Sequence, residues 1–307
     1  MITKHTTFIL GAGASNDYSY LLGVGLKQQI CNNLNRRAKR DKMIRVGFSE
    51  KTIDEFTRNF QKCNLLSIDT FLEKNKKFEK IGKVAIALAL IPLEVDNLGV
   101  ADKWYSYLYN KILSPNFEKF EHNKVGFITF NYDRSLEHFL ITSLMYTNEK
   151  NEEECAEKIK KIPIIHVYGQ LGYLPWQNKA KIRLYGSGIG DRAAVIESAE
   201  CIKIMHERRD EANLLEAYAL LERTEQIVFL GFGYDRTNID RLKISEHCKG
   251  KDIYGTTKGL GRGEILIAHK ALRQNHGGLV QLDIEGEERL DILTYIRKYI
   301  IQQLHIE

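Results

Sequence analysis

The sequence has little proline, no paired cysteines and no long apolar run. Only 4 of its 307 residues are proline, a composition that argues against long disordered linkers. The cysteines are widely spaced, and no two of them form a CxxC pair; they are Cys31, Cys63, Cys155, Cys201 and Cys248. This spacing argues against a zinc ribbon and against a disulfide framework, so we expect no bound metal.

No stretch approaches the roughly 18 consecutive apolar residues that a membrane-spanning helix needs. The first apolar run, TTFIL, is also too short for a signal peptide. The composition, with 43% hydrophobic and 28% charged residues, is ordinary for a soluble globular protein. We therefore expect a cytoplasmic protein that does not contact membranes.

The chain is mildly basic, with a net charge of +5 and an isoelectric point near 8.7. Such a charge permits binding to phosphates without requiring it. The densest basic stretch, residues 35–45, lacks the interleaved aromatic side chains of a nucleic-acid-binding surface, so we interpret it as a solvated helix face. A nucleic-acid partner is not implied.

Short apolar segments alternate with longer helical patterns along the chain. We predict strands at 6–10, 124–130, 162–167, 226–230, 252–255 and 279–284, with a further short strand at 181–185. We predict helices at 26–39, 51–62, 67–78, 84–91, 103–113, 133–145, 197–221, 238–246, 263–273 and 289–303. The residues at about 20–120 are mostly helical and fall between the first two strands, so we interpret them as an insertion within a single domain spanning 1–307.

This alternation predicts an α/β protein with a Rossmann-like parallel sheet covered on both faces. Ligands of such sheets bind outside the carboxyl ends of the strands. The turns that follow the predicted strands are therefore the places to search for a functional site.

The first two of these turns combine small and amide side chains. GAGAS at 11–15 follows the first strand, and its small residues would let the backbone approach a pyrophosphate; a tight turn without a ligand is the alternative. The second turn holds Asn131 and Asp133. An Asn side chain can orient a water or a carboxamide, but either residue could equally cap the helix that follows.

Two later turns and one helix start carry further candidates. His166 lies near the end of an apolar strand, where it would serve as a general base or as a core histidine with satisfied ring nitrogens. Gly231 and Gly233 suit the close passage of a nucleotide, or a simple turn. Asp69, in the segment SIDTFL, suits the first turn of a helix.

Taken together and in this order, GAGAS, SIDTFL, TFNYD, HVYGQLG and FLGFGY resemble the sirtuin-like superfamily, and most closely its bacterial antiphage-defence branch. The resemblance runs from about residue 6 to about residue 260. It implies a sirtuin-type domain that consumes NAD⁺ as its substrate, with Asn131 and His166 as catalytic residues. The implied NAD⁺-binding residues are Gly11, Ala12, Gly13, Ala14, Ser15, Asp69, Tyr132, Asp133, Tyr168, Gly169, Gly231 and Gly233.

Two departures from the sirtuin pattern matter. The four-cysteine zinc module of the deacylases is absent, which argues against protein deacylation. The family's catalytic His stands directly before Gly, whereas here Tyr168 precedes Gly169 and His166 lies two residues earlier. Alternate residues of a strand share a face, so either side chain could point toward the ligand.

The resemblance thus implies an NAD⁺ glycohydrolase that releases nicotinamide and ADP-ribose. In the expected mechanism Asn131 orients nicotinamide or the attacking water, and His166 acts as a base. Asp133 holds nicotinamide or orients Asn131. The alternatives are a sensor that binds NAD⁺ or an ADP-ribose-type signal without turnover, a transferase or deacylase, and a structural subunit whose helical region only assembles a complex.

Uncontrolled cleavage of NAD⁺ would kill the host cell, so such an activity must stay off until a trigger arrives. Members of the family achieve this through oligomers, fused sensor domains or partner proteins. We expect a homo-oligomer, a partner defence protein, or both. The residues at about 20–120 and the closing helix are the candidate surfaces.

Overall fold

The fold is built on six strands, which the computed structural model places in one sheet. The model describes residues 1–94, 102–113, 116–177, 180–204, 211–273, 277–282, 290–304 and 306. The strands are β1 (Thr6–Leu10), β2 (Val125–Thr129), β3 (Ile164–His166), β4 (Gln226–Leu230), β5 (Asp252–Gly255) and β6 (Val280–Leu282). All neighbours are parallel, in the order β3-β2-β1-β4-β5-β6, which is the strand order of a Rossmann-like fold.

The central strands are apolar along most of their length, as expected for strands covered on both faces. β1, β2 and β4 are buried at every position. The register aligns Phe8 with Phe127 on one side and with Val228 on the other, and the three side chains are inaccessible to solvent. The rings of Phe8 and Phe127 stack with their centroids 5.5 Å apart. This packing fixes β1 between its two neighbours.

The strand order also sets the place where a ligand can bind. The chain runs outward from β1 to β2 and β3, and then returns to place β4 on the other side of β1. Dinucleotides bind at such a switch point, at the carboxyl ends of the strands. The turns after β1 and β4 are joined there by hydrogen bonds from Gly11 N to Leu230 O, at 3.1 Å, and from Gly13 N to Gly231 O, at 2.9 Å.

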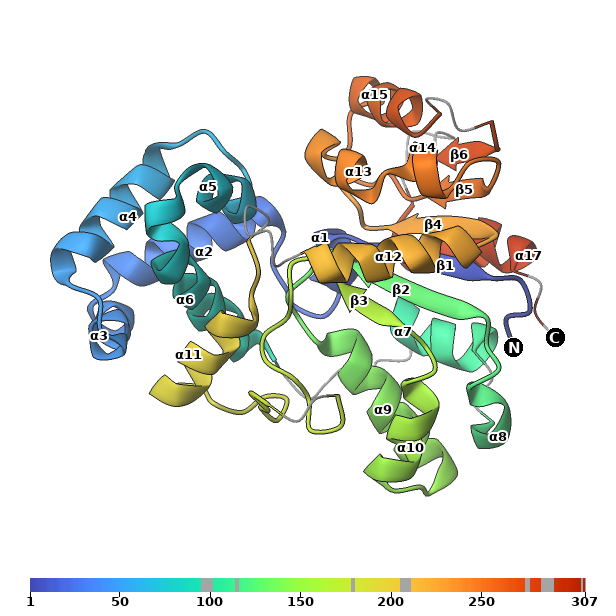
Figure 1. Cartoon of the computed structure of the whole chain (residues 1–307), viewed down its shortest axis with the longest axis horizontal. Helices are drawn as coiled ribbons and strands as arrows, with labels where there is room; N and C mark the ends of the chain where they lie inside the picture. Colours follow the sequence, from blue (N-terminus) through green and yellow to red (C-terminus); the bar gives the residue numbers. More distant parts are fainter. Residues whose placement is uncertain are drawn as a thin grey trace.

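The described residues between β1 and β2 form helices and no strand. Figure 1 shows α2–α6 gathered with α11 (Arg192–Cys201) beside the carboxyl ends of the strands. Aromatic rings form the centre of this group, with neighbouring centroids between 4.9 and 6.0 Å apart; the rings belong to Phe56, Phe60, Phe71 and Phe78. The elements are α1 (Ala12–Asn16), α2 (Gly23–Asn35), α3 (Arg37–Val46), α4 (Glu50–Lys62), α5 (Ile68–Lys74), η1 (Lys76–Phe78), α6 (Glu79–Leu90), η2 (Ile91–Leu93), α7 (Trp104–Tyr107), η3 (Leu108–Ile112) and α8 (Phe117–Phe120).

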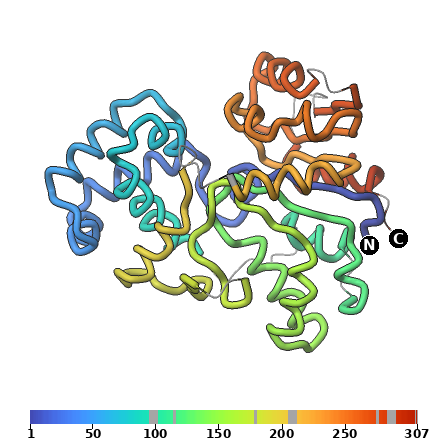
Figure 2. Tube along the Cα trace, viewed as in Figure 1, coloured from blue at the N-terminus to red at the C-terminus, as the bar shows by residue number. Residues whose placement is uncertain are grey.

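The helices after β2 complete the layers around the sheet. The two termini lie side by side (Figure 2), where Ile2 and Ile306 form a single antiparallel bridge. Across the described ranges, no helix combines the length and the apolar character needed to cross a membrane. The helices are α9 (Ser135–Asn148), α10 (Glu152–Ile159), α11, α12 (Glu211–Arg223), α13 (Arg236–Leu242), α14 (Ile244–His247), α15 (Arg262–Arg273), α16 (Ile292–Tyr295), η5 (Ile296–Ile300) and α17 (Ile301–Gln303).

The α/β class and the parallel sheet are confirmed, but the single helix predicted at 197–221 is wrong. The chain leaves the helix after Cys201, because Ile202 pairs with Gly169 and Lys203 N donates to Tyr168 O at 2.9 Å. The contact with the turn after β3 therefore ends α11, and α12 begins separately at Glu211.

Other predicted boundaries also differ from the structure. The strand predicted at 181–185 is a single bridge between Ile182 and Tyr173. The helix predicted at 238–246 breaks at Lys243, whose φ of 47° is left-handed, and the helix predicted at 26–39 breaks at the extended residue Arg36. The short helices α8 and α10 were not predicted. Residues 283–284 and 289 of the last two predicted elements lie outside the described residues.

Candidate functional site

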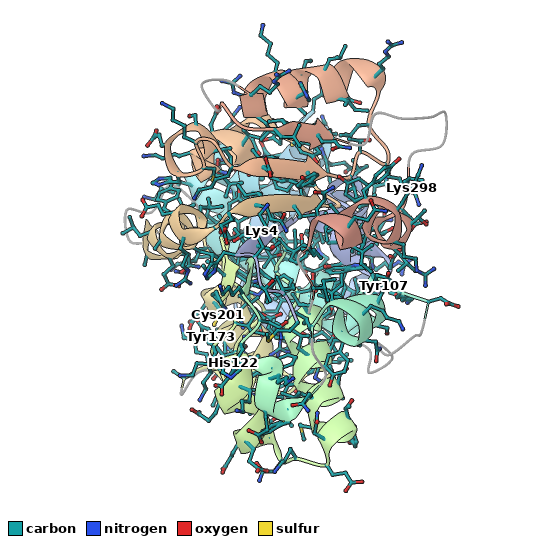
Figure 3. The ribbon with its side chains drawn as sticks, turned by 90° about the vertical axis from the view of Figure 1, so that its right-hand side faces the viewer. Lys4, Tyr107, His122, Tyr173, Cys201 and Lys298 are labelled. Atoms are coloured by element: carbon teal, nitrogen blue, oxygen red, sulfur yellow. The ribbon has the colours of Figure 1, made fainter. Side chains whose placement is uncertain are left out.

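The structure has a hollow at the amino ends of the strands, opposite the GAGAS turn. It is lined by polar residues that include His122, Lys124, Lys161 and Arg223. Figure 3 views this side, with Lys4 and His122 labelled. Lys161 and Arg223 stand at the carboxyl ends of α10 and α12, where cations complement the negative end of a helix. Rossmann-like sheets bind ligands at the other edge, so we place the candidate site at the carboxyl ends of the strands.

Three glycines of the two central turns are required by the chain itself. A Cβ on Gly11 would lie 2.6 Å from Gly231 O, and a Cβ on Gly13 would lie 2.8 Å from Gly231 Cα. A Cβ on Gly231, whose φ is +57°, would lie 2.2 Å from Ala14 N. The turns after β1 and β4 therefore pack backbone against backbone, and these glycines serve that contact whether or not a ligand binds.

Gly233 differs from these three glycines. Its φ lies outside the left-handed region, it is exposed, and a Cβ at this position would meet no heavy atom within 4 Å. The described chain therefore does not require a glycine here. A molecule that passes close to the β4 turn would require one.

Asn131 ties the turn after β2 to the turn after β1. Its side-chain amide donates to Gly11 O and to Ser15 Oγ, both at 2.9 Å. Its backbone N donates to Thr129 Oγ1 at 3.1 Å, which fixes the start of the turn. Because both amide hydrogens are engaged and the residue is half-buried, Oδ1 is the atom of this side chain that is left to accept a hydrogen bond from a ligand.

Asp133 accepts hydrogen bonds from Ser135, the first residue of α9. Its Oδ1 accepts from Ser135 N at 3.2 Å and from the Ser135 hydroxyl. Burial raises the pKa of this carboxyl, although hydrogen bonds from Ser135 and Ser15 oppose that shift. Asp133 thus satisfies the first backbone N–H of α9, and its hydrogen bond with Ser15 links it to the GAGAS turn, which Asn131 also contacts.

The protein engages both ring nitrogens of His166. Nδ1 donates to Asn131 O at 2.8 Å, and Nε2 lies 2.6 Å from Glu137 Oε1 at the start of α9. His166 is 4% exposed and Glu137 is 1% exposed. Burial alone would lower the pKa of His166, but the Glu137 carboxylate and the two hydrogen bonds outweigh it and raise that pKa.

This arrangement bears on the predicted catalytic role of His166. An imidazole that donates to a carbonyl through one nitrogen and pairs with a carboxylate through the other has no lone pair directed at a ligand. The geometry favours a positioning role, in which His166 holds the backbone of Asn131. Its role as a general base stays a prediction.

Tyr168 faces α13 from the turn after β3. Its hydroxyl donates to Asn238 Oδ1 of α13 at 2.8 Å and accepts from Arg241 of the same helix. Burial raises the pKa of this hydroxyl. Beside it, the Tyr132 hydroxyl donates to Asp69 of α5. Tyr132, Tyr168 and Asp69, all predicted from motifs, are therefore brought together at this edge of the sheet.

The remaining predicted residues lie around the same edge. Ala12 is half-buried at the start of α1, and Ala14 is buried with its carbonyl accepting from Trp104 Nε1 at 2.8 Å. Gly169 has a φ of +68°, and a Cβ there would lie 2.0 Å from Cys201 O. Gly169 is thus required by the contact between the β3 turn and the segment after α11.

Besides Glu137, sequence reasoning missed three polar residues of this edge. Glu73 lies on α5, and Asn238 and Arg241 lie on α13. Each occupies an ordinary position of an amphipathic helix, with no motif around it. Their place in the site follows from the hydrogen bonds that join α5, α13 and Tyr168 at the end of the sheet.

Asp69 gives the site a pH dependence. Burial raises the pKa of its carboxyl from 3.8 to about 6, against the opposing hydrogen bond from Ser67. The folded state therefore binds a proton that the unfolded state has lost, and the stability contributed by the protonated form is lost as pH rises from about 4 through about 6. We expect Asp69→Asn to remove this decline, measured as the unfolding midpoint between pH 4 and pH 7. An equal decline in both proteins would contradict the assignment.

Comparison with known proteins does not assign the chain to a family. No protein-family model matches the sequence, and no curated protein matches it. Within the part of the chain that the structure describes, no three His, Cys, Asp or Glu side chains are grouped so that they could hold a metal ion. The geometry of this edge and the motif resemblance are therefore the two grounds for inferring a function.

Proposed function

We propose that the chain binds NAD⁺ at the carboxyl edge of its sheet and cleaves the nicotinamide–ribose bond. One observation carries the proposal: the turns after β1, β2 and β4 meet at the switch point of a Rossmann-like sheet. Asn131 bonds the GAGAS turn through its side chain, and that turn packs against Gly231. These turns are the ones whose motifs resemble the NAD⁺-binding turns of sirtuin-like proteins, and dinucleotides bind at such switch points.

Cleavage of the glycosidic bond depends more on the positioning of the sugar and the water than on a strong base. When the glycosidic bond breaks, its electron pair moves to the pyridinium nitrogen, and the oxocarbenium-like ribose is captured at C1′ by water, which loses a proton to solvent. Holding the sugar and the water in place supplies most of the acceleration for such a step. In this proposal Asn131 Oδ1 orients the water or a ribose hydroxyl. His166 acts through Asn131 as a positioning residue.

The substitution Gly233→Ala tests whether the β4 turn contacts a ligand or has only a structural role. We expect the dissociation constant for ADP-ribose to rise about tenfold, or about 1.4 kcal/mol, because the added methyl group occupies the ligand's path. We expect the unfolding midpoint to stay unchanged, because the methyl group meets no atom of the chain within 4 Å. Calorimetric titration and thermal unfolding measure the two quantities.

The matched control for this variant is Gly231→Ala, two residues earlier in the same turn. Its left-handed φ and the 2.2 Å approach to Ala14 N predict a lower unfolding midpoint. If Gly233→Ala bound ADP-ribose as tightly as the wild-type chain, the ligand would not pass over the β4 turn.

A second candidate function is binding without turnover. The engagement of both ring nitrogens of His166, with Tyr168 directly before Gly169, favours a sensor for NAD⁺ or an ADP-ribose-type signal. Titration that shows binding of NAD⁺ with no release of nicotinamide would select this function over hydrolysis.

We also propose that the cleavage depletes cytoplasmic NAD⁺ as part of antiphage defence, and that self-assembly or a partner defence protein switches it on during infection. The basis is the motif resemblance together with the toxicity that uncontrolled NAD⁺ cleavage would have. Cellular NAD⁺ measured during phage infection should fall in cells that carry the wild-type chain and hold steady in cells that carry Asn131→Ala.

A further inference from the structure

Two helices from distant parts of the chain are joined beside the proposed NAD⁺ site. Arg241 of α13 donates from Nη2 to Glu73 Oε1 of α5 at 2.6 Å, and from Nη1 to the Tyr168 hydroxyl. The Arg241 and Glu73 side chains are 17% and 18% exposed, so the ion pair is largely shielded from solvent. The guanidinium also lies over the Tyr168 ring, 5.5 Å from its centroid.

The contacts of α5 differ between its two sides. Within the helical group α5 packs on α6 and η1, with Phe71 and Leu72 buried. Toward the sheet its carboxylates make polar contacts: Asp69 accepts from Tyr132, and Glu73 accepts from Arg241. In Figure 1, α5 belongs to the helical group beside the strand ends, and α13 stands across from it. The Glu73–Arg241 pair therefore joins the helical group to the second half of the sheet.

We propose that Arg241 is a phosphate-binding residue of the NAD⁺ site, and that it exchanges Glu73 for the ligand's pyrophosphate on binding. This inference rests on the proposed function. A guanidinium presents parallel N–H groups that fit carboxylate and phosphate oxygens alike. The exchange replaces one charge-assisted pair of Arg241 by another, and it leaves the hydrogen bond between Tyr132 and Asp69 as the remaining polar contact of α5 toward the sheet among the described residues. In the resting chain Glu73 competes with the ligand and holds α5 against α13, which couples ligand binding to movement of the helical group.

The test compares three single variants by two measurements. Hydrogen exchange reports how firmly the amides of α5 are held, and calorimetry gives the dissociation constant for ADP-ribose. Glu73→Gln should speed α5 exchange and tighten ADP-ribose binding, each about three- to tenfold, because it removes the competing carboxylate. Arg241→Met should also speed α5 exchange, but should weaken ADP-ribose binding at least about tenfold.

Arg236→Met is the matched control, because it removes the same charge from the same helix. Arg236 pairs with Asp240 at 2.8 Å, is 66% exposed and makes no described contact with α5. We expect it to change neither measurement. Unchanged α5 exchange in both Glu73→Gln and Arg241→Met would overturn the proposed tether. Wild-type affinity for ADP-ribose in Arg241→Met would overturn the phosphate role.

A titration with inorganic pyrophosphate tests the role of Arg241 independently of the proposed NAD⁺ function. Added at increasing concentration, it should speed α5 exchange in the wild-type chain and leave the already fast exchange of Arg241→Met unchanged. No acceleration in the wild-type chain would overturn the exchange of Glu73 for phosphate. If pyrophosphate acts as expected but the wild-type chain binds neither ADP-ribose nor NAD⁺, the proposed NAD⁺ function fails while Arg241 retains its anion-binding role.

Discussion

Replacing Glu94 by Gln is expected to lower the free energy of unfolding by about 3–5 kcal/mol, because it leaves two buried guanidinium groups without a counter-charge. The Glu94 carboxylate is fully buried between Arg134 and Arg183. Arg134 donates to it at 2.8 to 3.0 Å, and Arg183 donates to it at 2.6 and 2.7 Å. Burial lowers the pKa of Arg134, and the Glu94 carboxylate opposes that shift.

The Glu94 cluster joins three segments that frame the candidate site. Glu94 directly follows η2, Arg134 directly follows Asp133, and Gly186 N donates to Glu94 at 3.0 Å. Loss of the cluster should therefore loosen the β2 turn as well as the helical group. Denaturant unfolding followed by circular dichroism measures the change.

The control for Glu94→Gln is Glu55→Gln, which breaks the exposed pair between Glu55 and Lys77. Exposed ion pairs contribute little, so we expect its unfolding midpoint to match that of the wild-type chain. If Glu94→Gln were as stable as this control, the buried cluster would not hold the three segments together.

Replacing Asn131 by Ala is expected to lower the rate of NAD⁺ cleavage by about 10²- to 10³-fold, the usual effect of removing one positioned polar group from a reacting centre. The variant loses the amide hydrogen bonds to Gly11 O and Ser15 Oγ, together with the Oδ1 acceptor. Initial rates of nicotinamide release measure the effect.

The control for Asn131→Ala is Asn110→Ala, on the exposed face of η3, where the side-chain amide donates to Ser106 O of α7 at 2.8 Å. It should cleave NAD⁺ at the wild-type rate. Equal rates in Asn131→Ala and Asn110→Ala would remove Asn131 from the reaction.

The strands and turns of this fold could be predicted because their signals are local. Buried parallel strands are short apolar runs that end at polar or glycine turns, and the strands predicted at 6–10, 226–230 and 252–255 match β1, β4 and β5 to the residue. Ligand-binding turns follow strand ends by the geometry of the fold. The motifs at 11–15, 131–133 and 231–233 therefore come together as the strand pattern implies.

The contacts that decide how the site works could not be predicted, because each joins residues far apart in sequence. Glu137 pairs with His166 across 29 residues, and Glu73 pairs with Arg241 across 168. Local patterns report the period of a helix or a strand and not the partner of a side chain. For the same reason the break after Cys201 left no local signal, since it follows from pairing with the β3 turn.

The proposal on which the others depend is that the joined turns after β1, β2 and β4 hold NAD⁺ for hydrolysis. Its most direct test incubates the purified full chain with NAD⁺, at protein concentrations high enough for self-association, and separates the products by chromatography. We expect equal molar amounts of nicotinamide and ADP-ribose from the wild-type chain and almost none from Asn131→Ala. NAD⁺ that stays intact in the presence of wild-type chain that demonstrably binds it would contradict the claim.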